Sequence, residues 1–152
     1  MSRVRGDAMK IQRIQVDEIA VVRPLWEALN ELHGQLSSNF KEHFNRFTFE
    51  QRIAALRDRN SIAVFVAGGK KYPFGYCMAS IQASTGEIDS IFVLPEHRGR
   101  GVGDGLMGAA ESWLRSQNVS KIRVCVAEGN ETVMDFYQKR GFRHRFTVLE
   151  RS

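Results

Sequence analysis

The chain has 152 residues, of which 43% are hydrophobic and 26% are charged, with a formal net charge of +5. This length suits one domain and is too short for two domains that each have a hydrophobic core. No apolar run is long enough to cross a bilayer. The positive charge is spread along the chain, which argues against nucleic-acid binding. We therefore expect a soluble, cytoplasmic protein with one domain over residues 9–152. Residues 1–8, which hold no signal-peptide core, are expected to be a disordered extension or a cloning remnant.

The first half of the chain predicts one short strand and two helices. Alternating apolar residues predict a strand over residues 10–15. Apolar residues then repeat every three to four positions over residues 21–36, with Pro24 near the start, which predicts an amphipathic helix. Residues 37–47 break this pattern and are expected to form a loop, after which Thr48 is expected to cap a helix running to about residue 59.

The middle of the chain predicts an antiparallel meander of three strands. Strand-like runs over residues 62–67 and 74–81 are separated by Gly68-Gly69-Lys70-Lys71, which is a good hairpin connection. A third run follows over residues 87–94.

The last third of the chain predicts two more helices, each followed by a strand. The first helix runs from residue 102 to near residue 118, and residues 121–127 form a near-continuous apolar run that is typical of a strand buried on both faces. Asn130 is expected to cap the second helix, and residues 142–149 alternate enough to predict a final strand.

The cysteines and histidines show no arrangement that would bind a metal ion. Cys77 and Cys125 each lie in an apolar, strand-like segment, which favours two buried and reduced thiols. The histidines are scattered without the ligand spacing of a zinc site. We expect no metal cofactor.

The most informative stretch is Arg98-Gly99-Arg100-Gly101-Val102-Gly103, between the third strand of the meander and the helix that follows. A glycine-rich turn that opens a helix leaves backbone N–H groups unpaired, and so it forms a site for phosphate. No Gly-Lys-Ser/Thr follows Gly103, which excludes a P-loop, and the preceding meander excludes a Rossmann unit.

This stretch, written as Arg98-x-x-Gly101-x-Gly103, resembles the acyl-coenzyme A loop of the GNAT superfamily of N-acetyltransferases. Two more motifs resemble that superfamily: Ile91-Phe92-Val93-x-Pro95 before the loop, and Asn130-x-x-Val133-x-x-Phe136-Tyr137-x-x-x-Gly141-Phe142 after it. The motifs cover about residues 87–143, and the order of elements over residues 10–150 also matches. The resemblance implies an α/β (α+β) fold. Its mixed, mostly antiparallel sheet has about six to seven strands, with helices on both faces.

The resemblance further implies acetyl-coenzyme A as the acyl donor. The strands over residues 87–94 and 121–127 would splay apart to admit the pantetheine arm, which the main chain of Ile91 and Val93 would bind, while the loop amides hold the diphosphate. The cofactor-binding residues expected on this basis are Ile91, Phe92, Val93, Arg98, Gly99, Arg100, Gly101, Val102, Gly103, Asp104, Asn130, Phe136 and Tyr137.

Three residues are candidates for the chemistry. An amine is mostly protonated at neutral pH, so a base must accept its proton before or during attack on the thioester, either directly or through water. Glu87 and Asp89 are the two candidates for this base, and the two-residue period of a strand places them on one side. Tyr137 matches the family's general acid, which would protonate the departing thiolate. Tyr137 also lies on the apolar face of its predicted helix, where the alternative role of a tyrosine is packing in the core.

Two residues depart from the family pattern. Asp104 places a negative charge near the expected diphosphate, although a carboxylate in the first turn of a helix is itself favourable. Val133 replaces the usual alanine and could narrow the space beside the pantetheine arm.

The acceptor is left open by the sequence. In the family, the first two helices and their connecting loop form one wall of the acceptor site. The corresponding candidates are His33, Asn39, Phe40, Glu42 and Phe44. We expect transfer of an acetyl group to a primary amine of a small molecule by direct attack in a ternary complex. A protein N-terminal or lysine N-acetyltransferase and a non-catalytic acyl-coenzyme A sensor are the alternatives. Many members form homodimers, but the sequence specifies no contact surface.

Overall fold

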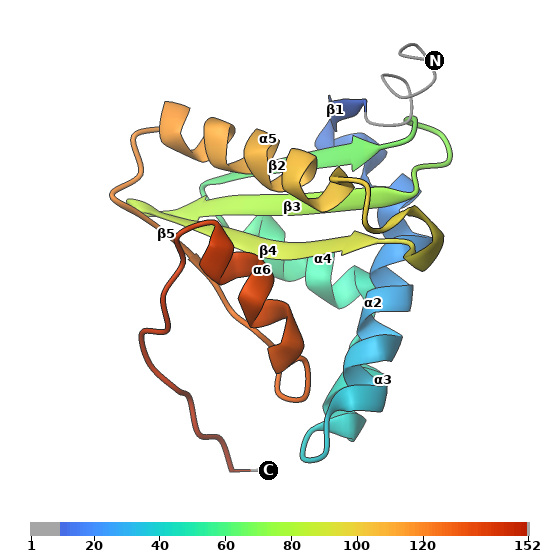
Figure 1. The fold of residues 1–152 in the computed structure, drawn as a ribbon, viewed down its shortest axis with the longest axis vertical. Coiled ribbons are helices and arrows are strands. Elements are labelled where there is room, and N and C mark those ends of the chain that lie inside the picture. The colour runs from blue at the N-terminus through green and yellow to red at the C-terminus, as the bar shows by residue number, and fades with distance from the viewer. Residues whose placement is uncertain (1–9, 152) are drawn as a thin grey trace.

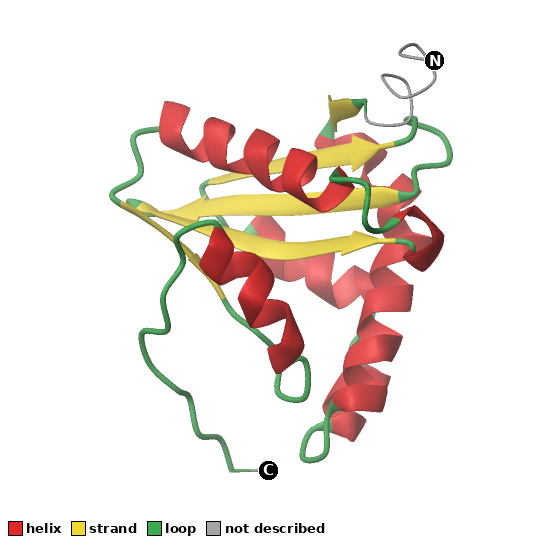
Figure 2. Ribbon diagram, viewed as in Figure 1, coloured by secondary structure: helices red, strands yellow, loops and turns green. Residues whose placement is uncertain are grey.

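The computed structural model describes residues 10–151, so the extension expected over residues 1–8 lies outside the described part of the chain. Figure 1 shows the elements in chain order and Figure 2 their types. The strands are β1 (Ile11–Ile14), β2 (Ser61–Ala67), β3 (Gly75–Gln82), β4 (Thr85–Val93) and β5 (Lys121–Val124). The α-helices are α2 (Arg23–Leu36), α3 (Lys41–Arg46), α4 (Phe49–Arg57), α5 (Val102–Ser116) and α6 (Met134–Lys139). The short 3₁₀ helices are η1 (Val16–Val22), η2 (Pro95–His97) and η3 (Glu131–Val133).

The sheet has the order β1-β2-β3-β4-β5, with antiparallel pairs except for the parallel pair of β4 and β5. The predicted meander of β2, β3 and β4 is therefore confirmed. Residues 10–151 contain five strands rather than the expected six to seven. The mixed sheet with helices agrees with the expected fold class.

Helices cover both faces of the sheet (Figure 2). Helices α2 and α4 pack on one face, where Leu25, Trp26 and Leu56 meet side chains of β2 and β3. Helices α5 and α6 pack on the other face, where Leu106 and Tyr137 belong to a second core cluster. This division follows from the strands, whose successive side chains point to opposite faces.

Local sequence explains where the helices begin. The hydroxyl of Thr48 accepts a hydrogen bond from the N–H of Gln51, and the Gln51 side chain accepts one from the N–H of Thr48. This capping box confirms Thr48 as the start signal for α4. Pro24 lies in the first turn of α2, where its missing N–H costs no hydrogen bond.

The expected loop over residues 37–47 is wrong in part, because it contains α3. Tertiary hydrogen bonds hold this short helix in place. The Asn30 side chain donates to the carbonyls of Phe44 and Phe47, and the Lys41 ammonium donates to the last carbonyls of α2. These contacts join neighbouring elements, so the periodicity of the segment alone could not reveal them.

The expectations for the end of the chain also differ from the structure. Residues 142–149 were expected to form a strand, but they adopt no regular secondary structure. Residues 121–127 were expected to form a strand buried on both faces, but β5 ends at Val124 and its side chains alternate between exposed and half-buried. Cys125 is exposed rather than buried, whereas Cys77 is buried as expected. Within residues 10–151, only β4 pairs with β5, which explains this exposure.

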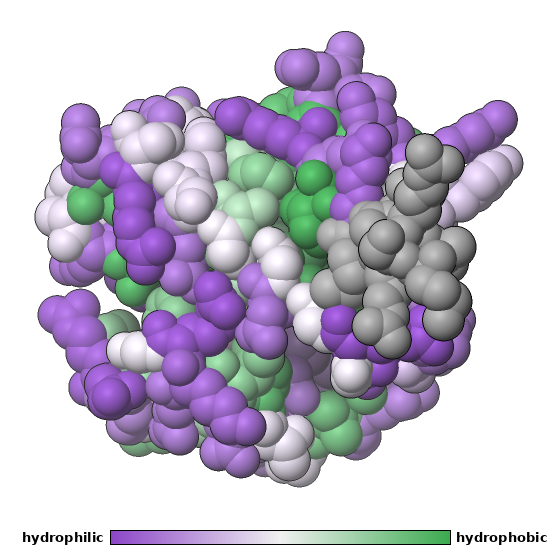
Figure 3. Space-filling view, turned by 45° about the horizontal axis from the view of Figure 1, so that its top comes forward, coloured by the Kyte–Doolittle hydropathy of each residue, from purple (hydrophilic) through white to green (hydrophobic). Residues whose placement is uncertain are grey.

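Charged and polar residues cover most of the face drawn in Figure 3, and apolar residues are visible between them. None of the helices formed by residues 10–151 combines the length and the hydropathy that a membrane span requires.

Candidate active site

The glycine loop has the geometry of an anion site. Gly99 and Gly101 adopt φ values of +76° and +82°, in the left-handed region that glycine enters without strain. Helix α5 begins directly after Gly101, and no side chain in the described part of the protein caps it. Within residues 10–151, the backbone N–H groups of residues 99–104 donate no hydrogen bond. These donors, at the positive end of the α5 dipole, are available to a diphosphate.

The strand that leads to this loop has a free edge. The pairing of β4 with β5 ends at Ile88 and Val124, whereas β4 continues to Val93. Beyond Ile88 the edge of β4 that faces β5 therefore has no strand partner among the described residues. This arrangement agrees with the expected divergence of the two strands, and it gives an extended ligand an edge to bind beside Ile91, Phe92 and Val93.

Side chains around the loop hold it against the sheet and against α6. The Arg98 Nε donates to the carbonyl of Val93 at 2.8 Å, and its guanidinium lies 5.1 Å from the centre of the Phe92 ring. The Arg98 side chain therefore turns back to β4, and the Val93 carbonyl is already engaged. On the other side, a Cβ at Gly103 would lie 3.4 Å from the Phe136 ring, so Phe136 closely borders the first turn of α5.

The negative charge of Asp104 is balanced by Arg140, which directly follows α6. The Arg140 Nη1 lies 3.2 Å from the Asp104 carboxylate, and the Arg140 Nε donates to the buried Glu111 at 2.8 Å. Arg140 thus links α6 to the first turn of α5. The unusual acid beside the loop is part of an ion pair.

Asp89 is a buried carboxylate on the free part of β4. It is the extra residue of a β-bulge, since Ile88 lies opposite Ala79 and Ser90 lies opposite Met78. Neither of its carboxylate oxygens has a hydrogen-bond partner within residues 10–151. Burial, together with the negative charge of the nearby Glu87, raises the pKa of Asp89 to about 7. A carboxyl with this pKa can both accept and release a proton near neutral pH.

Glu87 is held in a different environment. Its carboxylate lies 3.5 Å from the Arg59 guanidinium and 3.2 Å from that of Arg123, and its side chain is 14% exposed. Arg52 adds a third guanidinium to this face of the sheet, because its Nη2 donates to the backbone carbonyl of Asp89 at 2.8 Å. Sequence reasoning missed all three arginines, since they lie on other elements and no spacing relates them to β4.

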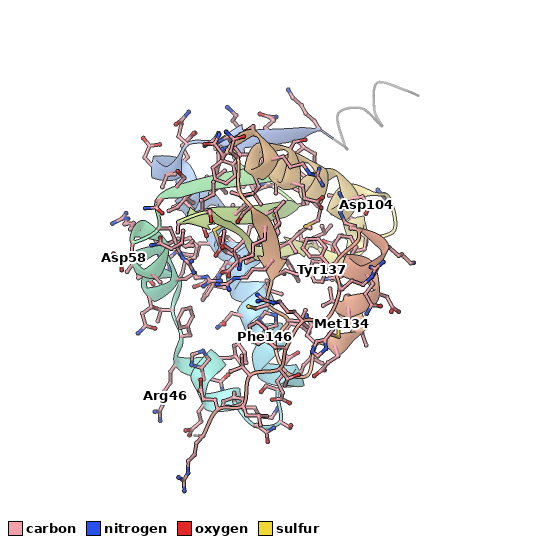
Figure 4. The ribbon with its side chains drawn as sticks, turned by 90° about the vertical axis from the view of Figure 1, so that its left-hand side faces the viewer. Arg46, Asp58, Asp104, Met134, Tyr137 and Phe146 are labelled. Carbon is pink, nitrogen blue, oxygen red and sulfur yellow. The ribbon has the colours of Figure 1, made fainter. Side chains whose placement is uncertain are left out.

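Tyr137 lies in the core cluster formed by α5 and α6, with 8% of its surface exposed. Its ring packs edge-on against Phe136 and Phe142, at centroid distances of 5.3 and 5.9 Å. Burial raises the pKa of the Tyr137 phenol, so the hydroxyl stays protonated and can donate a proton. Figure 4 labels Tyr137 and Asp104 on the α5–α6 side of the sheet and Asp58 on the opposite side.

Asn130 and Val133 lie in the segment before α6. Asn130 occupies the residue before η3, but its side chain makes no capping hydrogen bond, so its interpretation as a side-chain cap is wrong. Val133 is partly buried and packs against the same core cluster as Tyr137.

The structure does not gather the five acceptor candidates into one site. Asn39, Phe40 and Glu42 line an open cavity of about 770 Å³ between α3 and Glu150 near the C-terminus. Phe44 lines a second cavity of about 380 Å³ beside Trp26. His33 lines neither cavity. Its ring lies 5.3 Å from that of Phe44, and burial, aided by the positive charge of Arg52, lowers its pKa.

A carboxylate that the sequence did not flag fixes the loop before α3. Glu128 accepts hydrogen bonds from the hydroxyls of Ser37 and Ser38 and from the N–H groups of Ser38 and Asn39, at 2.6 to 3.1 Å. These bonds lower the pKa of Glu128 to about 2. Gly129 follows with a φ of +93°, and any side chain there would collide with the carbonyl of Leu36. The only signal of this contact in the sequence is an acid and a glycine directly after the strand predicted over residues 121–127.

Comparison with known proteins identifies the family. The model of the acetyltransferase (GNAT) family matches residues 25–142. A curated relative, an uncharacterized N-acetyltransferase of Methanocaldococcus jannaschii, is 29% identical over 97 residues, which are 60% of this chain and 43% of the relative. The chain therefore spans less than half of that relative's length.

Solved structures of acetyltransferases share the fold. A putative acetyl transferase from Pyrococcus furiosus has a TM-score of 0.75 at 20% identity, covering 94% of this chain and 99% of its own. The aminoglycoside N-acetyltransferase AAC(6')-Iy, solved in complex with CoA, has a TM-score of 0.67 at 19% identity, with coverage of 94% and 98%. The PaiA N-acetyltransferase from Thermoplasma acidophilum, also in complex with coenzyme A, has a TM-score of 0.70 at 18% identity, with coverage of 91% and 93%. With the family model matching most of the chain, this protein belongs to the GNAT family of acetyltransferases.

Proposed function

We propose that this protein transfers an acetyl group from acetyl-coenzyme A to a primary amine of a small molecule. The observation that carries the proposal is the free edge of β4, which leads directly into a glycine loop whose N–H groups are unbonded within the described residues. An extended edge and an anion site in this order match the two parts of coenzyme A, a pantetheine arm and a diphosphate.

The residues present suit this donor. The amides of residues 99–104 would hold the diphosphate, and Gly101 and Gly103 would let the backbone approach it closely. Ile91, Phe92 and Val93 would offer backbone groups to the pantetheine arm, while Phe136 would border the arm at the first turn of α5. Arg140 would keep Asp104 from repelling the diphosphate, because it neutralises that carboxylate.

Asp89 is the better of the two candidates for the base. Its buried carboxyl has a pKa of about 7, which suits proton transfer near neutral pH, whereas Glu87 already binds Arg59 and Arg123. Asp89 would accept the proton of the attacking amine either directly or through water. The freed amine would attack the thioester carbonyl, and the carbon–sulfur bond would then break.

Tyr137 would supply a proton to the departing sulfur. Its phenol is protonated because burial raises its pKa, and it lies on the α6 side of the sheet, next to the residue that borders the loop. A proton given to the thiolate as the carbon–sulfur bond breaks lowers the barrier for that step.

The acceptor side supports a small amine. Helix α3 lies on this side, and hydrogen bonds from Asn30, from Lys41 and to Glu128 hold it and the loop before it, so this wall of the acceptor site is fixed in place. Two structural neighbours are aminoglycoside acetyltransferases, one of them solved with sisomicin, which carries amines.

Calorimetry with coenzyme A, followed by a thiol-release assay with acetyl-coenzyme A, tests the proposal. The acceptor panel contains polyamines, aminoglycosides, amino acids and peptides. We expect binding, release of thiol with at least one small amine, and a loss of about 10²-fold or more in kcat for Tyr137→Phe. Tyr72→Phe, at an exposed position, is the matched control.

Each other outcome has its own meaning. Failure to bind coenzyme A would overturn the proposal. Binding without turnover on any amine would favour a sensor, and turnover on peptides alone would favour a protein N-acetyltransferase.

A further inference from the structure

Arg52 is a half-buried cation between α4 and β4. It comes from α4, on the side of the sheet where Figure 4 labels Asp58. Its Nη2 donates to the backbone carbonyl of Asp89 at 2.8 Å, and this is the only hydrogen bond that its side chain makes within residues 10–151. A guanidinium has five N–H donors in a planar fork, so most of the donors of Arg52 are unused.

The charge of Arg52 is not paired in the described part of the chain. Arg59 and Arg123, the other two guanidiniums of this region, both bind Glu87. Arg52 forms no ion pair with any of the described residues. The carboxyl of Asp89, whose pKa is about 7, is only partly charged near neutral pH. Three guanidiniums therefore lie beside little more than one full negative charge, and the region is positive.

The charge of Arg52 also acts on the wall formed by α2. Burial, aided by this charge, lowers the pKa of His33, so the His33 ring is neutral near pH 7. A neutral imidazole adds no charge to the region, and it offers one donor and one acceptor of hydrogen bonds. Arg52 therefore influences both the acceptor candidate His33 and the proposed base Asp89, and a ligand held between these two residues would lie in its field.

The acids on β4 and after β5 are already engaged within the chain. Glu87 binds two arginines, and Glu128 accepts four hydrogen bonds from the loop before α3. An acceptor with several positive charges would therefore meet the unpaired Arg52 without a free carboxylate from these two residues, and like charges repel. An acceptor that carries a negative group beside its amine would instead be attracted to Arg52.

We propose that the acceptor is a small primary amine that also carries a carboxylate or phosphate group, and that Arg52 binds this anionic group. The inference rests on the proposed acetyl transfer to a small amine, whose acceptor it narrows. The fork of a guanidinium matches a carboxylate or a phosphate in two parallel hydrogen bonds. Because Arg52 donates to the backbone of the proposed base, the anionic group and the amine would be only a few bonds apart, as in an amino acid or 2-aminoethyl phosphate.

Matched pairs of acceptors test the anionic group. Each amino acid is compared with its carboxamide, and 2-aminoethyl phosphate with ethanolamine, in a thiol-release assay with acetyl-coenzyme A. We expect kcat/KM to be about 10- to 100-fold higher for the anionic member of at least one pair, and that pair distinguishes a carboxylate from a phosphate. A carboxylate raises the pKa of the neighbouring amine, so a more reactive amine cannot explain the preference. Turnover without such a preference in any pair would overturn the inference.

Variants of Arg52 test the residue. Arg52→Gln should lower kcat/KM for the anionic acceptor by about 10- to 100-fold and change that for its uncharged partner by less than about threefold. Arg52→Lys keeps the charge without the fork and should retain part of the preference. The matched control is Arg57→Gln, at an exposed arginine of the same helix, which should retain all of it. Equal losses for both members of a pair in Arg52→Gln would show a structural role and contradict the inference.

Calorimetry on the protein loaded with coenzyme A separates this inference from the proposed function. Without an acetyl group no transfer occurs, so the titration measures binding of the acceptor alone. We expect the Kd of the anionic member to be about 10- to 100-fold lower than that of its uncharged partner, and Arg52→Gln to remove this difference. If the difference appears but no amine is acetylated, the anion site stands and the proposed transfer is wrong. If amines are acetylated but neither assay shows a preference that depends on Arg52, the transfer stands and the anion site is wrong.

Discussion

Glu87 and Asp89 are two residues apart on β4, yet the fold gives their carboxylates different surroundings. Glu87 binds two guanidinium groups, whereas the oxygens of Asp89 have no hydrogen-bond partner in the described chain. The sequence could nominate both acids from their place before the loop. It could not rank them, because Arg59 and Arg123 reach Glu87 from distant parts of the chain and the bulge at Asp89 has no sequence signature.

Asp89→Asn should separate these two acids. We expect kcat/KM to fall by about 10² to 10⁴-fold and to lose its rise as pH increases through about 7. A carboxyl whose pKa is raised by folding stabilises the folded state below its usual pKa, and this contribution is lost as pH rises through about 7. The variant should therefore unfold at a higher temperature than the wild type above that pH. A pH–rate profile and thermal melts measure both effects.

Glu87→Gln is the matched comparison for this pair. This variant should keep the rise of kcat/KM near pH 7, since Asp89 is still present. If Glu87→Gln alone removed that rise, Glu87 rather than Asp89 would be the base.

At the scale of elements, the sequence predicted the helices and strands whose signals are local. The cap at Thr48 marked the start of α4, and the glycine-rich stretch lies between β4 and α5, as its sequence indicated. The misses share a cause, since α3 depends on hydrogen bonds from Asn30 and Lys41, and β5 ends where its pairing with β4 ends. Such contacts leave no periodic pattern.

Gly101→Ala should weaken coenzyme A binding without unfolding the chain. Gly101 has a φ of +82°, and alanine in that region costs about 1–2 kcal/mol. The loop would change its backbone conformation to relieve this strain, and its amides would then no longer point together at the diphosphate. We therefore expect the Kd for coenzyme A, measured by calorimetry, to rise by about tenfold or more.

Gly108→Ala is the control on the same helix. It lies within α5 with open space around its Cβ position, and it should stabilise the protein by about 0.5–1 kcal/mol. Its affinity for coenzyme A should not change. Equal losses of affinity in both variants would argue against a role for the loop geometry.

At the scale of the whole molecule, the resemblance of the motifs predicted the fold class, while two long-range features escaped. The hydrogen bonds from Ser37 and Ser38 to Glu128 join the loop before α3 to the loop after β5, and no sequence pattern relates these two loops. Residues 142–149 alternate like a strand, and the sequence therefore predicted one, but they adopt no regular secondary structure.

Acid should release the loop before α3. Since the pKa of Glu128 is lowered to about 2, its contribution to stability is present above its usual pKa and is lost as pH falls toward about 2. Glu128→Ala should increase hydrogen exchange at residues 37–40 at neutral pH, as acid does in the wild type. Glu96→Ala, at an exposed acid outside this loop, should leave this exchange unchanged. Unaltered exchange in Glu128→Ala would show that other contacts hold the loop.

The contact between Ser37 and Glu128 also bears on the order of folding, because it joins residues 91 positions apart. The meander and its helices can form from contacts between near neighbours, whereas this contact requires most of the chain to be in place. We therefore expect the amides of residues 37–40 to gain protection last in a pulse-labelled refolding experiment. A nascent chain would complete the acceptor wall only after β5 has joined the sheet.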